Sequence, residues 1–430
     1  MMPMQNPPAI LPTAAQAQLK AVGAAHILVG IPCYNNQDSI ARVVSTVSQG
    51  LACHYPDLQS VVMVSDGGST DQTREQAKVS LPSHQTELVT VYRGVPGKGS
   101  ALRTIFAAAA ELDARACVCV DADLRSITPD WMHHMLEPVL VQNYDYIAPL
   151  YARYKYDGTI TNNLVYCLTR ALYGKRIRQP IGGDFAFAGW LARHYLKQPV
   201  WDTDVARFGI DIWMTLQAVV TGARIGQTNL GVKLHDPKDP ASALGPMFQQ
   251  VCGTLFHQID RDASFWKSGV GSEPIPTFGL DSILEPEAIA VDHSQLVQGF
   301  QQGFWAAQPL YRQIFSDPVY HALYQASLAE PDRLTIPGPL WARLLYELLA
   351  TFHHLPQDQD ALILPMTPLY LGQVASFVNQ TRRLDFGEAE AVIETLAQYF
   401  EQEKFYLLRL WPAEAMDRER IEAIQKLVTP

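Results

Sequence analysis

Cysteine is sparse and unpaired in this sequence. Six cysteines occur among 430 residues, and none forms a Cys-x-x-Cys pair. Most lie in apolar runs, as Cys117 and Cys119 do within a predicted strand. We interpret all six as reduced thiols in the core of a cytoplasmic protein, rather than as disulfides or zinc ligands.

Long hydrophobic runs and an excess of basic charge are also missing. No stretch of about 18 uninterrupted apolar residues occurs, so no transmembrane segment is predicted. Residues 1–25 form an N-terminal extension without the basic start and long apolar stretch of a signal peptide. The formal net charge of -10 argues against general binding to nucleic acid or anionic membranes. An acidic chain can still bind a diphosphate through a metal ion, a lysine or a helix N-terminus.

The sequence does contain a regular alternation of apolar runs and helical patterns between residues 26 and 150. The apolar runs that read as buried strands are 27–31, 61–64, 88–92, 116–120 and 144–149. This alternation predicts an α/β fold with a mostly parallel sheet covered by helices on both faces. Ligands of such sheets bind beyond the carboxyl ends of the strands, so we expect the site there.

After residue 150 the regular alternation of strand and helix patterns ends. Residues 151–260 contain two helical patterns and a glycine-containing loop, and we assign 26–283 to one α/β domain. Residues 284–430 are helical throughout by pattern, with Leu344 and Leu348 on one face. No chemical motif lies there, so we interpret this all-α region as a packing appendage or as the surface of a homo-oligomer.

Three Asp-x-Asp sequences are present, and their contexts differ. Asp121-Ala122-Asp123 directly follows a predicted buried strand, which would project both carboxylates past the sheet edge. Carboxylate oxygens suit Mg²⁺ or Mn²⁺, which can bridge them to a diphosphate. We therefore predict Asp121 and Asp123 as metal ligands, against the alternative of a solvated loop. The sequences at 202–204 and 358–360 read as surface turns or helix starts.

Lys98 lies in Gly94-Val95-Pro96-Gly97-Lys98-Gly99-Ser100, at a predicted strand-to-helix turn. The two glycines allow close backbone approach, and the helix start offers N–H groups to an anion. The spacing does not match the phosphate loop of nucleotide triphosphatases. We predict contact with a phosphate or nucleotide, and a plain turn is the alternative.

Five further residues have both a functional and a structural interpretation. Asp66 ends a strand and could bind a base or ribose, or it could cap the following helix. His235 could supply imidazole nitrogen to Mn²⁺, although a lone histidine is more often structural. Asp211 could cap an apolar helix or orient an acceptor hydroxyl. Arg153 and Thr161 could together hold a carboxylate.

In combination these motifs resemble the GT-A glycosyltransferases. They are more closely similar to the mannosylglycerate synthase and glucosyl-3-phosphoglycerate synthase families, over residues 27–256. The matching segments are Ile31-Pro32-Cys33-Tyr34-Asn35, Ser65-Asp66-Gly67-Gly68-Ser69-Thr70-Asp71, Pro96-Gly97-Lys98-Gly99, Asp121-Ala122-Asp123, Gln179-Pro180-Ile181-Gly182-Gly183, Phe208-Gly209-Ile210-Asp211 and Gly231-Val232-Lys233-Leu234-His235.

The resemblance implies a nucleotide-diphosphate sugar donor, held by residues 26–150, with an acceptor half at 151–260. It implies Mg²⁺ or Mn²⁺ bound by Asp121, Asp123 and His235. The donor-binding residues that it implies are Pro32, Tyr34, Asn36, Asp66, Lys98, Asp121, Ala122, Gly183 and Asp184.

On the acceptor side, Arg153 and Thr161 resemble residues that hold glycerate, and Asp211 resembles an acceptor-side aspartate. The implied reaction is transfer of glucose or mannose to D-glycerate with retention of anomeric configuration. Thr159 stands where the phosphoglycerate enzymes have an arginine, which weakens the case for a phosphorylated acceptor. Asn36 stands where the relatives have glutamate, so the base of the nucleotide stays open.

Three alternatives are kept. An inverting family-2-type transferase would use Asp211 as base on a saccharide or lipid acceptor. A nucleotidyltransferase would need a glycine-rich basic loop after the first strand, which residues 32–36 do not supply. A non-catalytic nucleotide-sugar sensor would not need the full set of Lys98, Asp121, Asp123 and His235.

Overall fold

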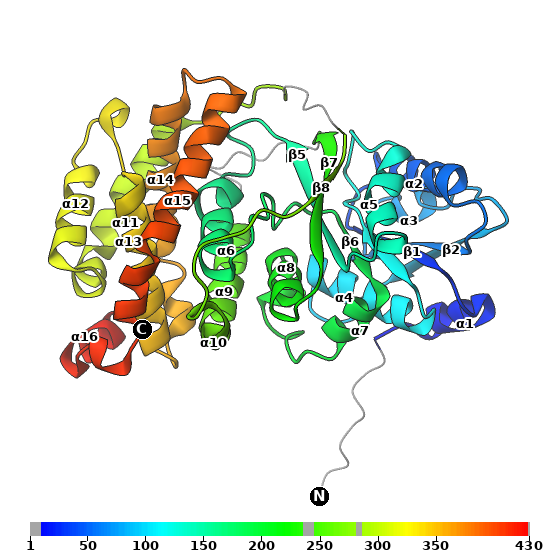
Figure 1. Ribbon diagram of the computed structural model, residues 1–430, viewed down its shortest axis with the longest axis horizontal. Coiled ribbons are helices and arrows are strands. Elements are labelled where there is room, and N and C mark those ends of the chain that lie inside the picture. The colour runs from blue at the N-terminus through cyan, green and yellow to red at the C-terminus, as the bar shows by residue number, and fades with distance from the viewer. Residues whose placement is uncertain (1–9, 235–244, 281–285, 429–430) are drawn as a thin grey trace, which may run out of the picture. The chain divides into compact units, whose positions relative to one another are not determined.

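The computed structural model describes residues 10–234, 245–280 and 286–428, and the chain divides into two compact units (Figure 1). The sheet unit consists of Met1–Ala152, Ile181–Asp236 and Ile275–Leu284. The helical unit consists of Arg153–Pro180, Pro237–Pro274 and Glu285–Pro430. The two units are therefore interleaved along the chain, which differs from the single boundary expected between residues 283 and 284.

The sheet unit is built on one eight-stranded sheet in the order β3-β2-β1-β4-β6-β5-β7-β8. Its strands are β1 Ile27–Cys33, β2 Ser60–Asp66, β3 Gln85–Val91, β4 Ala116–Cys119, β5 Tyr146–Ala152, β6 Phe185–Ala188, β7 Ile225–Val232 and β8 Thr277–Gly279. Of these described strands, β6 alone is antiparallel to its neighbours β4 and β5. The expected α/β fold with a mostly parallel sheet is confirmed.

Helices pack against both faces of this sheet. They are α1 Thr13–Val22, α2 Ile40–His54, α3 Thr73–Gln76, α4 Lys98–Glu111, α5 Asp130–Leu140, α7 Gly189–Leu196 and α8 Ile210–Val220, with the 3-10 turn η2 Asp204–Ala206. On one face, Val29 of β1 joins an apolar cluster with Val43 of α2 and Trp131 of α5. On the other face, Gly30 lies against Ile105 of α4. Successive strand residues point to opposite faces, so burial on both explains the continuous apolar runs in the sequence.

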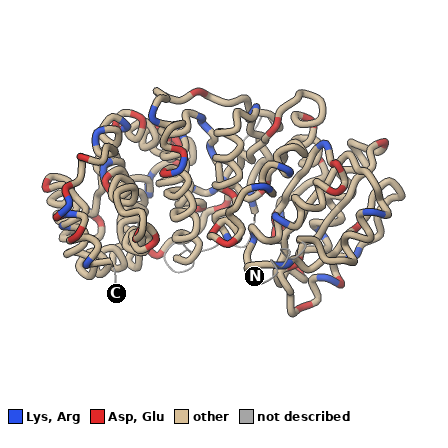
Figure 2. Tube along the Cα trace, turned by 90° about the horizontal axis from the view of Figure 1, so that it is seen from below, with Lys and Arg blue, Asp and Glu red and all other residues tan. Residues whose placement is uncertain are grey.

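The helical unit contains the remaining helices. They are α6 Tyr166–Tyr173, α9 Gly245–Arg261, α10 Ala263–Trp266, α11 His293–Ile314, α12 Asp317–Ser327, α13 Gly338–His354, α14 Met366–Thr381, α15 Phe386–Leu410 and α16 Arg418–Val428, with the π-helical turn η1 Thr161–Val165 and the 3-10 turns η3 Pro331–Arg333, η4 Gln359–Leu362 and η5 Ala413–Ala415. Helix α11 packs against α14, while α15 packs against both α6 and α13. Leu344 and Leu348 are buried in α13, as their shared spacing predicts. Acidic and basic residues are interspersed along the chain in both units (Figure 2).

One segment, Gln359–Thr381, is long and apolar enough to cross a membrane by length and composition. It contains α14, and 67% of its apolar window is buried inside the protein. A core helix meets the same two criteria, so the segment is weak evidence for a membrane span.

The cysteines are free thiols, as expected, but they are not all in the core. Five are buried, whereas Cys53 is exposed on α2. The error has a simple cause, because Cys53 lies near the end of an amphipathic helix whose buried face ends at Leu51.

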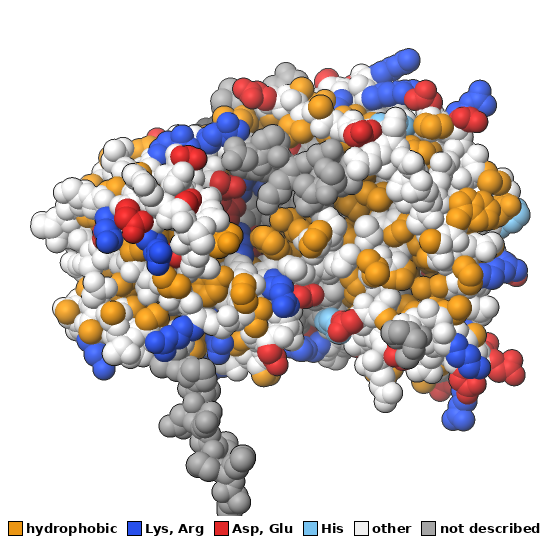
Figure 3. All heavy atoms as spheres, turned by 180° about the vertical axis from the view of Figure 1, so that it is seen from behind, with side chains coloured by type: hydrophobic (Ala, Val, Ile, Leu, Met, Phe, Trp, Pro, Cys, Tyr) orange, Lys and Arg blue, Asp and Glu red, His pale blue; other side chains and the backbone are white. Residues whose placement is uncertain are grey.

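Large hydrophobic side chains are also exposed in the helical unit, including Trp305, Leu364 and Phe405. Hydrophobic side chains are scattered over the face of the molecule seen in Figure 3. Self-association through the helical region remains a prediction.

Candidate active site

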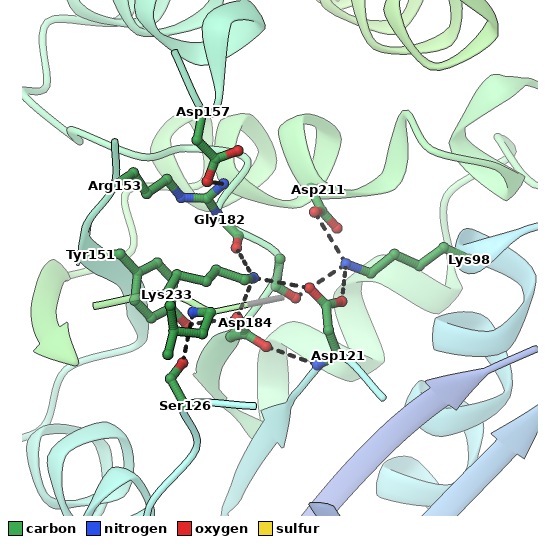
Figure 4. A network of polar contacts seen from close by, with 12 residues as sticks. Lys98, Asp121, Ser126, Tyr151, Arg153, Asp157, Gly182, Asp184, Asp211 and Lys233 are labelled. Carbon is green, nitrogen blue, oxygen red and sulfur yellow. Dashed lines mark hydrogen bonds and ion pairs between the residues drawn. The ribbon is translucent and has the colours of Figure 1, made fainter. Parts of the chain in front are cut away.

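Several polar side chains of the sheet unit meet at one edge of its sheet (Figure 4). Lys98 begins α4 after β3, Asp121 follows β4, and Lys233 follows β7. Asp184 immediately precedes β6, and because β6 is antiparallel, its start lies at the edge where its neighbour β4 ends. The site is therefore at the carboxyl edge of the parallel strands, where the sequence placed it.

Asp121 lies between two lysine ammonium groups. Its Oδ1 is 2.8 Å from Nζ of Lys98, and its Oδ2 is 3.1 Å from Nζ of Lys233. Its backbone N–H donates a hydrogen bond to Oδ1 of Asp184 at 2.8 Å. These three bonds fix the carboxylate just beyond the end of β4.

Each ammonium also contacts a second carboxylate and a backbone carbonyl. Lys98 Nζ lies 3.2 Å from Oδ2 of Asp211 and 3.1 Å from the carbonyl oxygen of Gly183. Lys233 Nζ lies 2.8 Å from Oδ2 of Asp184 and 2.9 Å from the carbonyl oxygen of Gly182. Tyr151 of β5 donates its hydroxyl hydrogen to the same Asp184 oxygen at 2.6 Å. With three aspartates and two lysines in contact, this cluster has one formal negative charge in excess.

Burial and charge pull the pKa values of this cluster in opposite directions. Burial would lower the pKa of Lys98, but Asp121 and Asp211 outweigh it and hold that pKa well above its ordinary value. Burial would raise the pKa of Asp121, but Lys98 and Lys233 hold it well below its ordinary value. For Asp211 burial dominates and raises the pKa, although Lys98 opposes it.

Asp211 has one oxygen in use and one to spare. It lies in the first turn of α8, is 8% exposed, and bonds Lys98 through Oδ2. Its Oδ1 is buried and has no hydrogen-bond partner among the residues that the structure describes. A buried carboxylate oxygen without a partner is costly, so a donor group of a ligand would be favoured there.

The loop before β6 requires glycine at position 183. Gly183 has φ of 96°, and a Cβ there would collide with Oδ2 of Asp121 and crowd Nζ of Lys233. The predicted donor-binding residues Gly183 and Asp184 therefore lie directly beside Asp121 and the two lysines.

The glycines next to Lys98 have a role different from the expected one. A Cβ at Gly99 would collide with the carbonyl oxygen of Val205, and the N–H of Gly99 donates to the carbonyl oxygen of Arg207 at 3.0 Å. These glycines thus let α4 approach the backbone of the 205–207 loop. The close approach that we predicted for a phosphate is occupied at Gly99 by protein backbone.

The loops after β1 and β2 form a second polar region of the sheet unit. Asn36 donates its N–H to Oγ1 of Thr73 at 2.7 Å, and Tyr34 is 60% exposed. Asp66 is fully buried, and its Oδ2 accepts hydrogen bonds from the N–H groups of Gly68 and Ser69, both at 3.0 Å. Asp66 therefore shapes this loop from inside, which agrees with the capping alternative.

Two more predicted donor-binding residues, Pro32 and Ala122, are buried and contact mainly other parts of the protein. Pro32 is buried and pairs with Ser65 across β1 and β2. Ala122 is 4% exposed, and its carbonyl oxygen accepts a hydrogen bond from Ser39 at 2.7 Å. A ligand could contact either residue only through the small surface that it leaves open.

The predicted metal ligands are described in part. Asp121 and Asp123 lie together beyond β4, and His235 lies outside the described residues. Within the described ranges no group of three or more His, Cys, Asp or Glu side chains is arranged to hold a metal ion. The two other Asp-x-Asp sequences lie at the 3-10 turns η2 and η4, as expected.

Arg153 and Thr161 belong to the helical unit, where a tight turn brings them together. Gly158 has φ of 72°, and a Cβ there would lie 3.7 Å from Nη1 of Arg153 and 3.9 Å from Oγ1 of Thr161. Arg153 also pairs with Asp157 at 3.4 Å. The guanidinium and the hydroxyl thus border the same point above Gly158, and we call this arrangement the Gly158 cradle.

Comparison with known families decides the class of protein. Residues 28–198 match the model of glycosyl transferase family 2. This segment is a family 2 glycosyltransferase domain. The match covers β1 to β6 and includes Lys98, Asp121 and Asp184, so the expected GT-A fold and the expected enzyme class are confirmed.

Solved structures similar to this glycosyltransferase include glucosyl-3-phosphoglycerate synthase from Mycobacterium tuberculosis. Its complex with Mn²⁺, UDP and phosphoglyceric acid is 23% identical, covering 58% of this chain and 86% of that chain with a TM-score of 0.42. Its complex with phosphoglyceric acid is 23% identical, covering 65% and 98% with a TM-score of 0.43. No curated protein sequence matches this chain at a significant level. Identities and TM-scores this low assign no substrate to this glycosyltransferase.

Sequence reasoning missed two residues of the glycosyltransferase site, Lys233 and Tyr151. Lys233 lies two positions before His235, in a segment already singled out, and a lysine in an otherwise apolar run was a usable signal. Tyr151 lies in β5 but two residues beyond the predicted strand 144–149. Its hydroxyl reaches Asp184 only because β6 lies between β4 and β5, and an antiparallel insertion of that kind leaves no mark in the strand–helix rhythm.

Proposed function

We propose that this glycosyltransferase transfers glucose or mannose from a nucleotide-diphosphate sugar to the 2-hydroxyl of D-glycerate, with retention of anomeric configuration. The observation that carries the proposal is the set of exchangeable charges at the sheet edge, where Lys98 and Lys233 flank Asp121. Ammonium groups bind phosphate oxygens as readily as carboxylates. The same lysines can therefore turn to a donor diphosphate when it binds.

The proposed metal is Mg²⁺ or Mn²⁺, with Asp121, Asp123 and His235 as the residues that would hold it. The carboxylate donors fit a hard cation, and the excess negative charge of the cluster favours one. When bound, such an ion would neutralise charge on the leaving diphosphate. The two lysines contribute to the same end from the protein itself.

In the proposed reaction the acceptor oxygen bonds to the anomeric carbon on the face from which the diphosphate leaves. The bond from that carbon to the diphosphate oxygen breaks, and this oxygen takes the hydroxyl proton. Lys98 would bind and stabilise the departing nucleoside diphosphate. The spare Oδ1 of Asp211 is available to accept a hydrogen bond from a substrate hydroxyl and so to orient it.

The Gly158 cradle supports a carboxylate-bearing acceptor. A guanidinium and a hydroxyl that border one point can bind the two oxygens of a carboxylate. Thr159, at the position where the phosphoglycerate enzymes have an arginine, is fully buried and bonded to Tyr370. This position therefore offers no cation to a second anionic group, which favours D-glycerate over 3-phosphoglycerate.

The test is a transfer assay with the purified full-length protein. UDP-glucose, GDP-glucose and GDP-mannose are each offered with D-glycerate or 3-phosphoglycerate, with Mg²⁺, with Mn²⁺ and after chelation. We expect an α-linked glycosylglycerate, lost in Asp123→Ala and after chelation. Asp360→Ala is the matched control, because Asp360 ends another Asp-x-Asp sequence and its side chain is 91% exposed. Metal-dependent donor binding without transfer to either acid would overturn the proposed acceptor.

An inverting reaction with Asp211 as general base is the second candidate. It is favoured by the raised pKa of Asp211 and by the spare oxygen that it keeps beside the cluster. The anomeric configuration of the product separates the two candidates, because inversion gives the β-linked product from an α-linked donor.

A further inference from the structure

The segment that forms the Gly158 cradle is bonded to two helices more than 170 residues later in the chain. The first bonds come just after Arg153. Lys155 is 9% exposed and donates hydrogen bonds to the carbonyl oxygens of Thr381 and Leu384, at 2.8 and 2.7 Å. A cation at the carboxyl end of a helix satisfies carbonyls that lack partners within the helix, and here it ties the cradle to the end of α14.

The second set of bonds starts from Thr159, between Gly158 and Thr161. Thr159, directly after Gly158, shares a hydrogen bond of 2.6 Å with the hydroxyl of Tyr370 on α14. Tyr370 is itself stacked on Phe248 of α9, with ring centroids 4.4 Å apart. The residue that follows the left-handed turn is therefore held by a side chain that cannot move freely.

The third set holds the π-helical turn that begins at Thr161. Trp341 of α13 donates its indole N–H to the carbonyl oxygen of Asn163 at 2.6 Å, and both residues are buried. Gln373 of α14 donates to the side-chain oxygen of Asn163 at 3.3 Å. A π-helical turn departs from regular helical bonding, so bonds from outside help to fix where Thr161 points.

We propose that α13 and α14 position the acceptor cradle, with Trp341, Tyr370 and Gln373 as positioning residues for Arg153 and Thr161. The C-terminal helices then serve the reaction itself and are more than a packing appendage. The inference rests on the proposed function in one respect, namely that the cradle binds the acceptor.

The experiment compares Trp341→Phe with Trp266→Phe in the full-length protein. Trp266 is a matched control, since it is also fully buried in the helical unit and donates its indole N–H to a backbone carbonyl, that of Ile259, at 2.8 Å. Kinetics with D-glycerate, hydrolysis of the donor by water and amide hydrogen exchange of residues 155–165 are measured for each. Gln373→Met is a milder second variant, because Oε1 of Gln373 is buried without a partner among the described residues.

We expect Trp341→Phe to raise the KM for D-glycerate by about tenfold, because a small displacement of binding groups weakens catalysis strongly. Amide exchange of residues 155–165 should become faster by a similar factor, while donor hydrolysis stays within about twofold of wild type. Gln373→Met should raise the KM by about threefold, and Trp266→Phe by less than about twofold.

Two results would overturn the positioning role. One is an equal rise in KM in both tryptophan variants, and the other is donor hydrolysis that falls in step with transfer. If wild-type protein transfers to neither acid, the proposed function fails by itself. In that case the exchange rates still decide the inference, which is wrong if Trp341→Phe and wild type exchange residues 155–165 equally fast.

Discussion

Two clusters of buried charge in this glycosyltransferase are built in different ways. In the sheet unit, Lys98 and Lys233 share Asp121, and each also contacts a backbone carbonyl. In the helical unit, Arg170 of α6 is 2% exposed and bonds two glutamates of α15, with 2.5 Å to Glu394 and 3.0 Å to Glu401.

The difference lies in how easily the partners can be exchanged. An ammonium is a compact charge with freely rotating donors, so a phosphate can replace a carboxylate beside it. A guanidinium bonds carboxylates through a rigid fork, as Arg178 does with both oxygens of Glu390 at 2.9 Å. The first cluster is suited to binding a ligand, and the second to joining residues 166–178 to α15. Loss of the first should therefore reduce activity, and loss of the second should reduce stability.

The largest effect should follow removal of the charge shared by the two lysines. Asp121→Asn keeps the size of the side chain but removes a proposed metal ligand and the partner of both ammonium groups. We expect transfer to fall by about a thousandfold, as when a preorganised charge is removed from an active site. The free energy of unfolding should change by less than about 2 kcal/mol, since Asp184 and Asp211 still pair with the lysines. A transfer assay measures the loss of activity, and urea unfolding measures the change in stability. Near-normal transfer by Asp121→Asn would contradict the assignment of the first cluster to ligand binding.

The matching change in the helical unit should act on stability instead. Arg170→Met removes a buried cation from Glu394 and Glu401, whose side chains are 41% and 19% exposed, and we expect the free energy of unfolding to fall by about 2–3 kcal/mol. Donor hydrolysis at 25 °C should stay within about twofold of wild type. Arg343→Met is the control, because the Arg343–Glu403 pair is also bidentate but Arg343 is 47% exposed, so its loss should cost less than about 1 kcal/mol. Equal losses in urea unfolding would show that burial does not distinguish the two pairs.

A smaller effect is expected from a substitution in the Gly158 cradle. Gly158→Ala introduces a methyl group between Arg153 and Thr161, and we expect the KM for the acceptor to rise about tenfold while the KM for the donor is unchanged. Gly222→Ala isolates the backbone strain, because Gly222 has φ of 74° with nothing within 4 Å of an added Cβ. Both variants should lose about 1 kcal/mol of stability. An acceptor KM raised equally by both substitutions would mean that strain, and not occupation of the cradle, is the cause.

Much of the sheet unit could be predicted because each strand and the turn after it can be recognised from residues that are adjacent in the sequence. Each buried parallel strand leaves a continuous apolar run, and each run of this kind is followed by its own polar turn. Asp121 and Lys98 could be named because both lie in such turns, whereas Asp184, which precedes the antiparallel strand β6, was named only through the resemblance to known families. Lys233 left a signal as a lysine in an otherwise apolar run, but its contact with Asp121 depends on the pairing of β5 with β7, which periodicity does not report.

The helical unit was harder to predict for a physical reason. Its bonds join residues far apart in sequence, as Trp341 with Asn163 and Arg170 with Glu401. A helical pattern states which face is apolar but not which helix will cover it. Glu390, Glu394 and Glu401 lie on one face of α15, yet nothing in their spacing identifies Arg170 or Arg178 as their partners.

The interleaving of the two units restricts how this protein can be shortened or recombined. Helix α6 packs against α15, and α9 packs against α13, although α6 and α9 precede residue 284. A form that ends at residue 283 would keep both helices and lose the partners that cover their apolar faces, and such faces promote aggregation. A chimera joined at residue 283 would contain α6 and α9 without α13 and α15, so the hydrophobic core of the helical unit would be incomplete. Only the exchange of all three segments together would transplant a complete helical unit into another glycosyltransferase.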